Sequence, residues 1–70
     1  MNTCSVNHDW KIRVIEERDE LSCKLHNLRV FLDADISKLG VSKEQVVLLI
    51  DQEYFMDRYL QVLNKRIESF

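Results

Sequence analysis

The feature that most constrains this chain is an apolar repeat in its second half, residues 42–70. From position 46 onward, apolar side chains recur in alternating steps of three and four residues. This is the spacing of a helix that buries one stripe against another helix. The stripe consists of Val46, Leu49, Glu53, Met56, Leu60, Leu63, Ile67 and Phe70, and only Glu53 interrupts its apolar character. A stripe of this length needs a partner helix, so the repeat predicts an all-α fold.

The first half of the chain supplies the partner. Residues 8–32 contain no Gly or Pro, and Val14, Leu21 and Leu25 recur in helical phase. We therefore predict a single domain over residues 1–70. It is an antiparallel two-helix hairpin with helices at about 8–32 and 43–69. Residues 1–7 are polar and without a pattern, and we expect them to be flexible.

The connection between the two helices carries specific local signals. Gly40, the only glycine, suits a left-handed backbone position after a short turn. Ser42 followed by Gln45 has the spacing of a capping box, in which each residue satisfies a free backbone amide at the start of a helix. Ile36 and Leu39 are the apolar residues of the turn, and we expect both to fold back over the end of the hairpin.

Charge and apolar content narrow the possible partners. The chain has ten basic and twelve acidic residues, a net charge of -2. Such a balance argues against binding to duplex nucleic acid, which requires a basic footprint. The first residues lack a basic segment followed by an apolar core, so we expect no signal peptide. The longest apolar run, Val46–Ile50, is too short to span a membrane. We expect a soluble, cytoplasmic protein with its two cysteines, Cys4 and Cys23, reduced.

Catalytic and metal-binding patterns are weak. Cys4 with His8, and Cys23 with His26, have spacings that could each hold two zinc ligands. The predicted first helix would separate the two pairs by roughly 25 Å, so we expect no metal site and no cofactor. No nucleophile motif or glycine-rich phosphate loop is present, and an enzyme is not expected. We expect Glu53 to pair with a basic residue of the facing helix, such as Arg18 or Lys24.

One edge of the predicted hairpin collects aromatic and polar side chains, and we call it the Tyr59 edge. It consists of Trp10, Glu17, Lys24 and Phe31 from the first helix and Gln45, Gln52, Tyr59 and Arg66 from the second. Folding the chain about the middle of the connection places Trp10 near Arg66 and Lys24 near Gln52. One interpretation is a core margin with a Trp10–Arg66 cation–π contact. The other is a ligand wall, where aromatic rings stack on a base and cations hold phosphate.

The second helix also has apolar residues outside the stripe. Its first half is apolar almost all round, which is typical of a helix that is buried on more than one side. In a hairpin this small, only another chain can provide that second cover. We therefore predict a homo-oligomer whose interface contains Val47, Ile50, Tyr54 and Phe55.

Both helices resemble a known family. The first pattern is Trp10-x2-Arg13-Val14-x2-Glu17-x3-Leu21-x2-Lys24-x3-Leu28-x2-Phe31-Leu32. The second is Leu49-x2-Gln52-x3-Met56-x2-Tyr59-x3-Leu63-x2-Arg66-Ile67-x2-Phe70. Over residues 10–70 the chain resembles small phage-encoded helical-hairpin proteins that are related to a crAss-like phage protein. It is similar in plan to the phage anti-CBASS and anti-Thoeris sponges.

The resemblance implies an antidefence function in the cytoplasm of a bacterial host. Sponges of this kind form oligomers, typically hexamers, and sequester the cyclic nucleotide signals of bacterial immune systems without cleaving them. The ligand would be a cyclic di- or trinucleotide or a molecule of the cyclic ADP-ribose type. The expected ligand-binding residues are Arg13, Lys24, Gln52, Tyr59 and Arg66. The alternative is an oligomeric helical-hairpin interaction module that inhibits or tethers a host protein.

Overall fold

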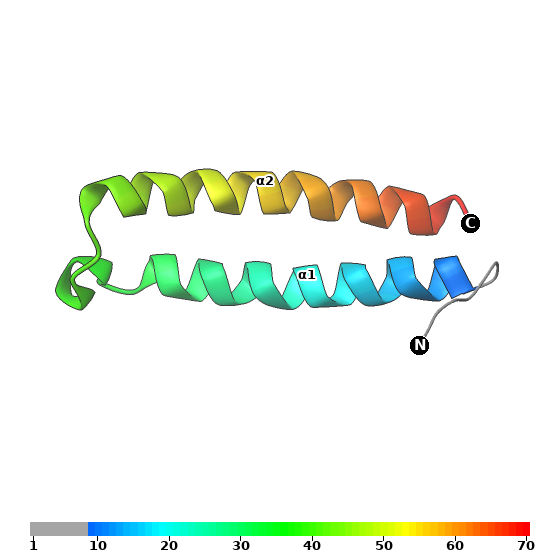
Figure 1. The fold of residues 1–70 in the computed structure, drawn as a ribbon, viewed down its shortest axis with the longest axis horizontal. Helices are drawn as coiled ribbons and strands as arrows, with labels where there is room; N and C mark the ends of the chain where they lie inside the picture. The colour runs from blue at the N-terminus through cyan, green and yellow to red at the C-terminus, as the bar shows by residue number, and fades with distance from the viewer. Residues whose placement is uncertain (1–8) are drawn as a thin grey trace.

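Two long helices lie side by side and antiparallel in the computed structural model, which describes residues 9–70 except for the side chains of Asp9 and Ser37 (Figure 1). Helix α1 spans Asp9–Asp33 and helix α2 spans Lys43–Glu68. A short 3-10 helix, η1, spans Ile36–Leu39 in the connection. The predicted all-α hairpin is confirmed. The flexibility expected for residues 1–7 concerns positions outside the described residues.

The connection is built largely as its sequence indicates. Gly40 has φ 77° and ψ 17°, the left-handed conformation that costs glycine least. The Ser42 hydroxyl oxygen accepts a hydrogen bond from the Gln45 backbone N–H at 3.2 Å, so Ser42 caps α2. Ile36 is half-buried, but Leu39 keeps 61% of its surface exposed. The expectation that Leu39 covers the hairpin end is therefore wrong, because the single turn of η1 directs only one of the two side chains inward.

The core lies along the predicted stripe. Among the described residues, the buried hydrophobic side chains are Val14, Leu21, Leu25 and Leu63. Val14, Leu21 and Leu63 form one cluster, and Met56, Leu60 and Ile67 pack against it and are partly buried. The core is thin because two helices cover each other on one side only. Several seam residues, such as Met56, are therefore only partly buried, and Phe70 at the end of the stripe remains 41% exposed.

A second edge, which we call the Arg29 edge, carries the polar contacts between the helices. It consists of Arg18, Arg29, Glu53, Asp57 and Asn64. Arg29 Nε donates to Glu53 at 2.8 Å, and its Nη2 donates to Asp57 at 3.0 Å. Arg18 donates to Asn64 at 3.0 Å and to its neighbour Asp19. Glu53 thus pairs with a basic residue of the facing helix, as predicted, but that residue is Arg29 rather than Arg18 or Lys24.

The direction of helical side chains explains this difference. Arg18 on α1 reaches Asn64, which lies near the end of α2. Side chains of a helix lean toward its own N-terminus. In an antiparallel pair the two N-termini lie at opposite ends, so the tips lean in opposite directions. Contacts therefore join residues whose backbone positions are offset along the two helices.

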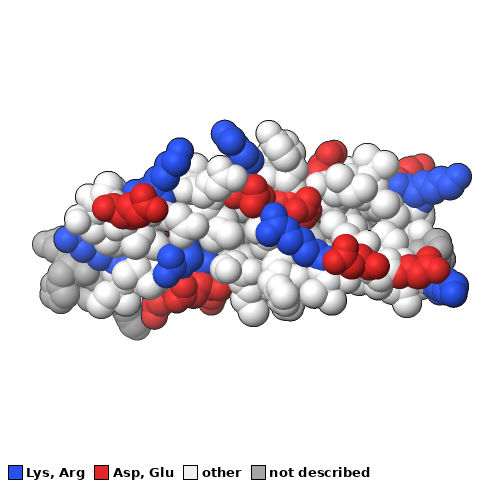
Figure 2. Space-filling view, turned by 180° about the vertical axis from the view of Figure 1, so that it is seen from behind, with Lys and Arg blue, Asp and Glu red and all other residues white. Residues whose placement is uncertain are grey.

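The surface outside the seam is mixed in charge. Figure 2 shows acidic and basic side chains interleaved over the face behind the ribbon view, without a large patch of one sign. Within residues 9–70, neither helix has a stretch that is long and apolar enough to cross a membrane. The outward side of α2 is different in character, because several large apolar side chains on it are more than half exposed.

Candidate functional site

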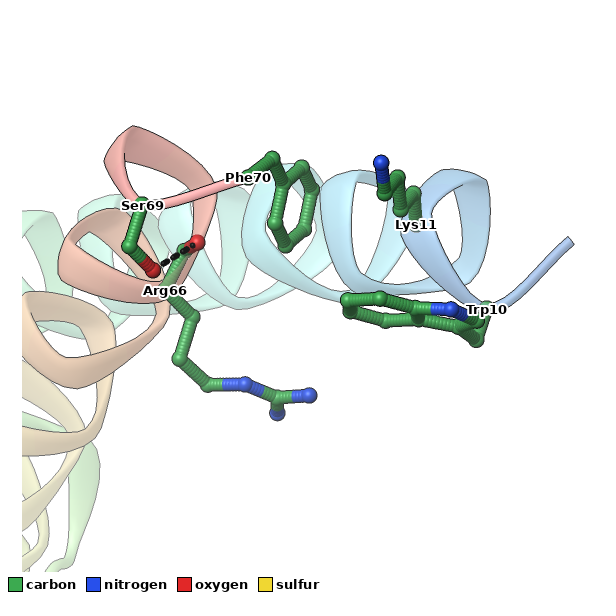
Figure 3. A pocket seen from close by; sticks show the side chains of 5 residues that line it. All are labelled: Trp10, Lys11, Arg66, Ser69 and Phe70. Carbon is green, nitrogen blue, oxygen red and sulfur yellow. Dashed lines mark hydrogen bonds between the residues drawn. The ribbon is translucent and has the colours of Figure 1, made fainter. Parts of the chain in front are cut away.

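A hollow of about 400 Å³ lies at the open end of the hairpin, where the start of α1 meets the end of α2. Its lining residues are Trp10, Lys11, Arg66, Ser69 and Phe70 (Figure 3). Among residues 9–70, α1 begins and α2 ends at this place. This volume falls within the range of roughly 300–1,000 Å³ that is usual for small-molecule sites.

Two aromatic rings form one part of the hollow. Trp10 and Phe70 make an edge-to-face contact, with ring centroids 5.1 Å apart and an interplanar angle of 80°. Trp10 is 43% exposed and Phe70 is 41% exposed, so this contact leaves much of both side chains uncovered. Exposed faces of this kind can stack on a planar ligand.

Two cations complete the hollow. Lys11 Nζ lies 5.9 Å from the Trp10 ring centroid and 5.8 Å from that of Phe70, near the outer limit for a cation–π contact. The predicted cation–π partner of Trp10 was Arg66; the contact observed is with Lys11. The Arg66 side chain extends toward the part of the hollow where Trp10 lies (Figure 3). Its backbone oxygen accepts the Ser69 hydroxyl at 2.8 Å. The guanidinium makes no hydrogen bond or ion pair with any of residues 9–70, so its donors remain available to a ligand.

The structure brings only one of the five predicted ligand-binding residues into this hollow. Arg66 lines it, and Trp10 lies beside Arg66 as the predicted edge pairing requires. Arg13 is exposed on α1, less than one turn beyond Trp10. Tyr59 is 44% exposed, two turns before Arg66.

The remaining two predicted residues lie farther along the Tyr59 edge. Lys24 and Gln52 are both exposed, and Gln52 Nε2 donates to Met56 Sδ at 3.7 Å. Fourteen residues separate Gln52 from Arg66, or about 21 Å along the helix. The five side chains therefore do not converge on one small molecule within a single hairpin. They form a line that starts at the hollow.

Lys11, Ser69 and Phe70 are residues of the hollow that were not predicted as ligand-binding. Phe70 is the last residue of the apolar stripe, so the sequence repeat assigns it to packing. The signal that could have identified Lys11 and Phe70 is their place near the start of α1 and after the end of α2.

The Arg29 edge offers less to a ligand. Its central guanidinium is already held by two carboxylates, at 2.8 and 3.0 Å. The hydrogen bonds that Arg29 donates, first to Glu53 and then to Asp57, raise the pKa of Arg29 above its usual value. Because the pKa of Arg29 is higher in the folded protein than in the unfolded chain, the positive charge on Arg29 stabilises the fold. This stabilisation is lost only as pH rises through the pKa that Arg29 has in the folded protein. Arginine stays protonated throughout the physiological range, so these ion pairs do not respond to pH there through Arg29.

The pattern of cysteines and histidines gives no metal centre among the described residues. Cys4 and His8 lie outside them. Within residues 9–70, no three His, Cys, Asp or Glu side chains gather in a way that could hold a metal ion. Cys23 is an exposed free thiol.

Comparison with known proteins assigns the chain to a family. Residues 8–69 match the model of the family Sequestin, which covers all of both helices. No curated protein matches the chain, and no solved structure does. The family name denotes sequestration of a ligand, which is a binding role rather than a catalytic one. With nearly the whole chain matched, this helical hairpin belongs to the Sequestin family.

Proposed function

We propose that this protein is a phage antidefence sponge that binds a cyclic nucleotide immune signal and sequesters it without cleaving it. The ligand is a cyclic di- or trinucleotide or a molecule of the cyclic ADP-ribose type. Membership of the Sequestin family supports the sequestering role. The similarity in plan to the phage anti-CBASS and anti-Thoeris sponges supports the class of ligand.

The observation that carries the proposal is the chemistry of the hollow at the open end. Exposed aromatic faces of Trp10 and Phe70 stand beside the cations of Lys11 and Arg66. A nucleotide presents a flat base together with an anionic phosphate, and it needs both kinds of contact at once. A guanidinium without a partner in the described chain suits a phosphate, because it can donate two parallel hydrogen bonds.

The rest of the ligand would follow the Tyr59 edge. In this proposal Arg13 and Arg66 hold phosphate groups at the open end, and Tyr59 stacks on a base and donates a hydrogen bond from its hydroxyl group. Lys24 and Gln52 lie about 21 Å from the hollow along the helices, so they bind a different part of an extended ligand or a ligand held between chains. Gln52 reads a base or ribose edge there.

Assembly belongs to the same proposal. Chains associate through Val47, Ile50, Tyr54 and Phe55 into a homo-oligomer, such as the hexamer typical of the sponges that the chain resembles. These four side chains are 51–67% exposed in the single hairpin. The uncovered apolar surface also favours the second candidate function, an interaction module that inhibits or tethers a host protein.

A binding and recovery experiment tests the sponge. The purified chain is dialysed against cyclic di- and trinucleotides and cyclic ADP-ribose isomers. Bound ligand is then released by heat and identified by chromatography. We expect one class of ligand to be retained in stoichiometric amounts and recovered intact. Retention of none of them contradicts the sponge and leaves the interaction module, whereas recovery of a hydrolysed product contradicts sequestration without cleavage.

A further inference from the structure

The outward side of α2 is an uncovered apolar surface on a protein with little core. Six large apolar side chains of this helix are each more than half exposed: Val47, Leu48, Ile50, Tyr54, Phe55 and Val62. Tyr54 and Phe55 contact one another edge to face, with ring centroids 5.4 Å apart. A hairpin of this size rarely gains enough stability from its own core, and association is one of the usual remedies.

A line of four charges runs along the middle of this surface. Glu44, Asp51, Arg58 and Lys65 follow one another at intervals of seven residues, so they lie on one stripe of α2. All four are exposed. None of their side chains forms an ion pair or hydrogen bond with any of residues 9–70. The order of the charges along the helix is acidic, acidic, basic, basic.

We infer that this surface binds a second copy of the same chain, with the two α2 helices antiparallel about a two-fold axis. In this arrangement Asp51 of each copy faces Arg58 of the second copy. Glu44 likewise faces Lys65 of the second copy. Every residue in the charge line thus meets an opposite charge, as a self-complementary two-fold interface requires.

The charge line also excludes the neighbouring arrangements. A parallel pair would place Asp51 against Asp51 and Arg58 against Arg58 of the second copy. An antiparallel pair displaced by seven residues would bring either the two Asp51 carboxylates or the two Arg58 guanidiniums together. Like charges that face each other in an interface are unfavourable, so the order of charges selects one direction and one register.

The apolar residues agree with that register. The two-fold axis passes beside Tyr54 and Phe55, so each ring meets its own symmetry mate. Leu48 then faces Val62 of the second copy. Aromatic side chains near the middle of an interface often supply much of its binding energy, and here they flank the charge line. The inference does not depend on the proposed ligand, because it uses only the outward side of α2.

Charge reversal tests both the surface and its register. Light scattering of the full chain at high micromolar concentration is expected to give twice the monomer mass or an even multiple of it. Asp51→Arg and Arg58→Asp each place like charges opposite one another, twice in every pair because of the two-fold axis. Each variant alone is expected to dissociate at least about tenfold more readily, since exposed ion pairs contribute up to ~1 kcal/mol each. Circular dichroism checks that the variants remain helical.

Mixing the two variants gives the decisive result. One copy then carries two arginines and the other two aspartates, so both pairs are attractive again and a mixed dimer forms. The double variant Asp51→Arg with Arg58→Asp carries both reversals in every copy, so opposite charges face each other again between two identical copies. It covers the case of a single variant that does not fold. Glu16→Arg, an equivalent reversal on the exposed side of α1, is the control and leaves the mass unchanged.

Several outcomes would overturn the inference. A monomeric wild-type chain would do so, as would single variants that associate as tightly as the wild type. Failure of both the mixture and the double variant to associate would also contradict the register. If Glu16→Arg dissociates the dimer as strongly as Asp51→Arg, the dissociation is a general effect of net charge and not the loss of the proposed contact.

Discussion

The Arg29 edge carries its hydrogen bonds and ion pairs between the helices, whereas the polar side chains of the Tyr59 edge make none across the hairpin among residues 9–70. Both edges border the same apolar seam. On one, Arg29 is held by Glu53 and Asp57. On the other, Arg66 extends into a hollow beside Trp10 (Figure 3). The same residue type thus closes the fold on one edge and is left for another molecule on the opposite edge.

The Arg29 edge thus joins the two helices, whereas the Tyr59 edge is left for a ligand. Mutations on each edge test this division. Substitutions in the seam should damage both edges. Substitutions on the Tyr59 edge should lower ligand affinity with little effect on unfolding, and those on the Arg29 edge should do the reverse. The following variants are arranged from the largest expected effect to the smallest.

The largest effect is expected in the shared seam. Leu63 is 1% exposed, and Leu63→Ala leaves a cavity in a thin core. The free energy of unfolding should fall by about 2–5 kcal/mol, which is enough to unfold much of the protein and to abolish ligand binding. Urea denaturation followed by circular dichroism measures the loss. Leu39→Ala, at a residue that is 61% exposed, is the control and should change the free energy by less than ~0.5 kcal/mol.

The next effect concerns ligand affinity at the open end. Arg66→Gln removes a charged donor from the hollow and leaves a shorter, neutral amide. Hydrogen bonds to charged groups contribute about 1.5–3 kcal/mol, so the Kd should rise at least about tenfold, with an unchanged midpoint of unfolding. Calorimetric titration measures the Kd. Lys43→Gln, which removes one positive charge near the other end of α2, should leave the Kd unaltered; an equal loss there would mean that net charge alone drives binding.

A smaller effect on affinity is expected in the middle of the Tyr59 edge. Tyr59→Phe removes one hydroxyl group and keeps the ring for stacking. A neutral hydrogen bond contributes about 0.5–1.5 kcal/mol, so the Kd should rise by a few fold. Stability should not change, because Tyr59 is 44% exposed. A Kd that stays the same in both Tyr59→Phe and Tyr59→Ala would remove Tyr59 from the site.

The smallest effect is expected on the Arg29 edge. Arg29→Gln breaks the pairs with Glu53 and Asp57, and exposed ion pairs contribute little to stability. The melting temperature should fall slightly at low salt, and the difference from the wild type should shrink as salt screens the pairs. Differential scanning calorimetry at two salt concentrations measures it. If ligand affinity instead falls as far as in Arg66→Gln, the division between the two edges is wrong.

The fold follows closely from the sequence because its determinants are local or periodic. Alternating steps of three and four residues specify the seam, and Ser42 and Gly40 specify where the helices can begin and end. The sequence predicted a basic partner for Glu53 on the facing helix but suggested Arg18 and Lys24 rather than Arg29. Arg29 lies beside the seam, and its reach depends on how side chains lean along each helix.

The candidate site was less predictable for a related reason. Spacing along a helix places Tyr59 and Arg66 on one edge, and the structure agrees that Trp10 lies beside Arg66. Spacing does not show where an edge becomes hollow. The hollow lies where the start of α1 meets the end of α2, and Lys11 and Phe70 line it there.

Thermal denaturation with ligand tests the central claim of sequestration most directly. The full chain is melted alone and with each cyclic di- or trinucleotide or cyclic ADP-ribose isomer at about 1 mM. A ligand with a Kd of about 10 µM or tighter adds at least ~2.7 kcal/mol at that concentration, which for a chain this small raises the melting temperature by ~10 °C or more. We predict such a rise with at least one of these ligands. A cooperative transition whose melting temperature is unchanged by all of them would contradict the sponge.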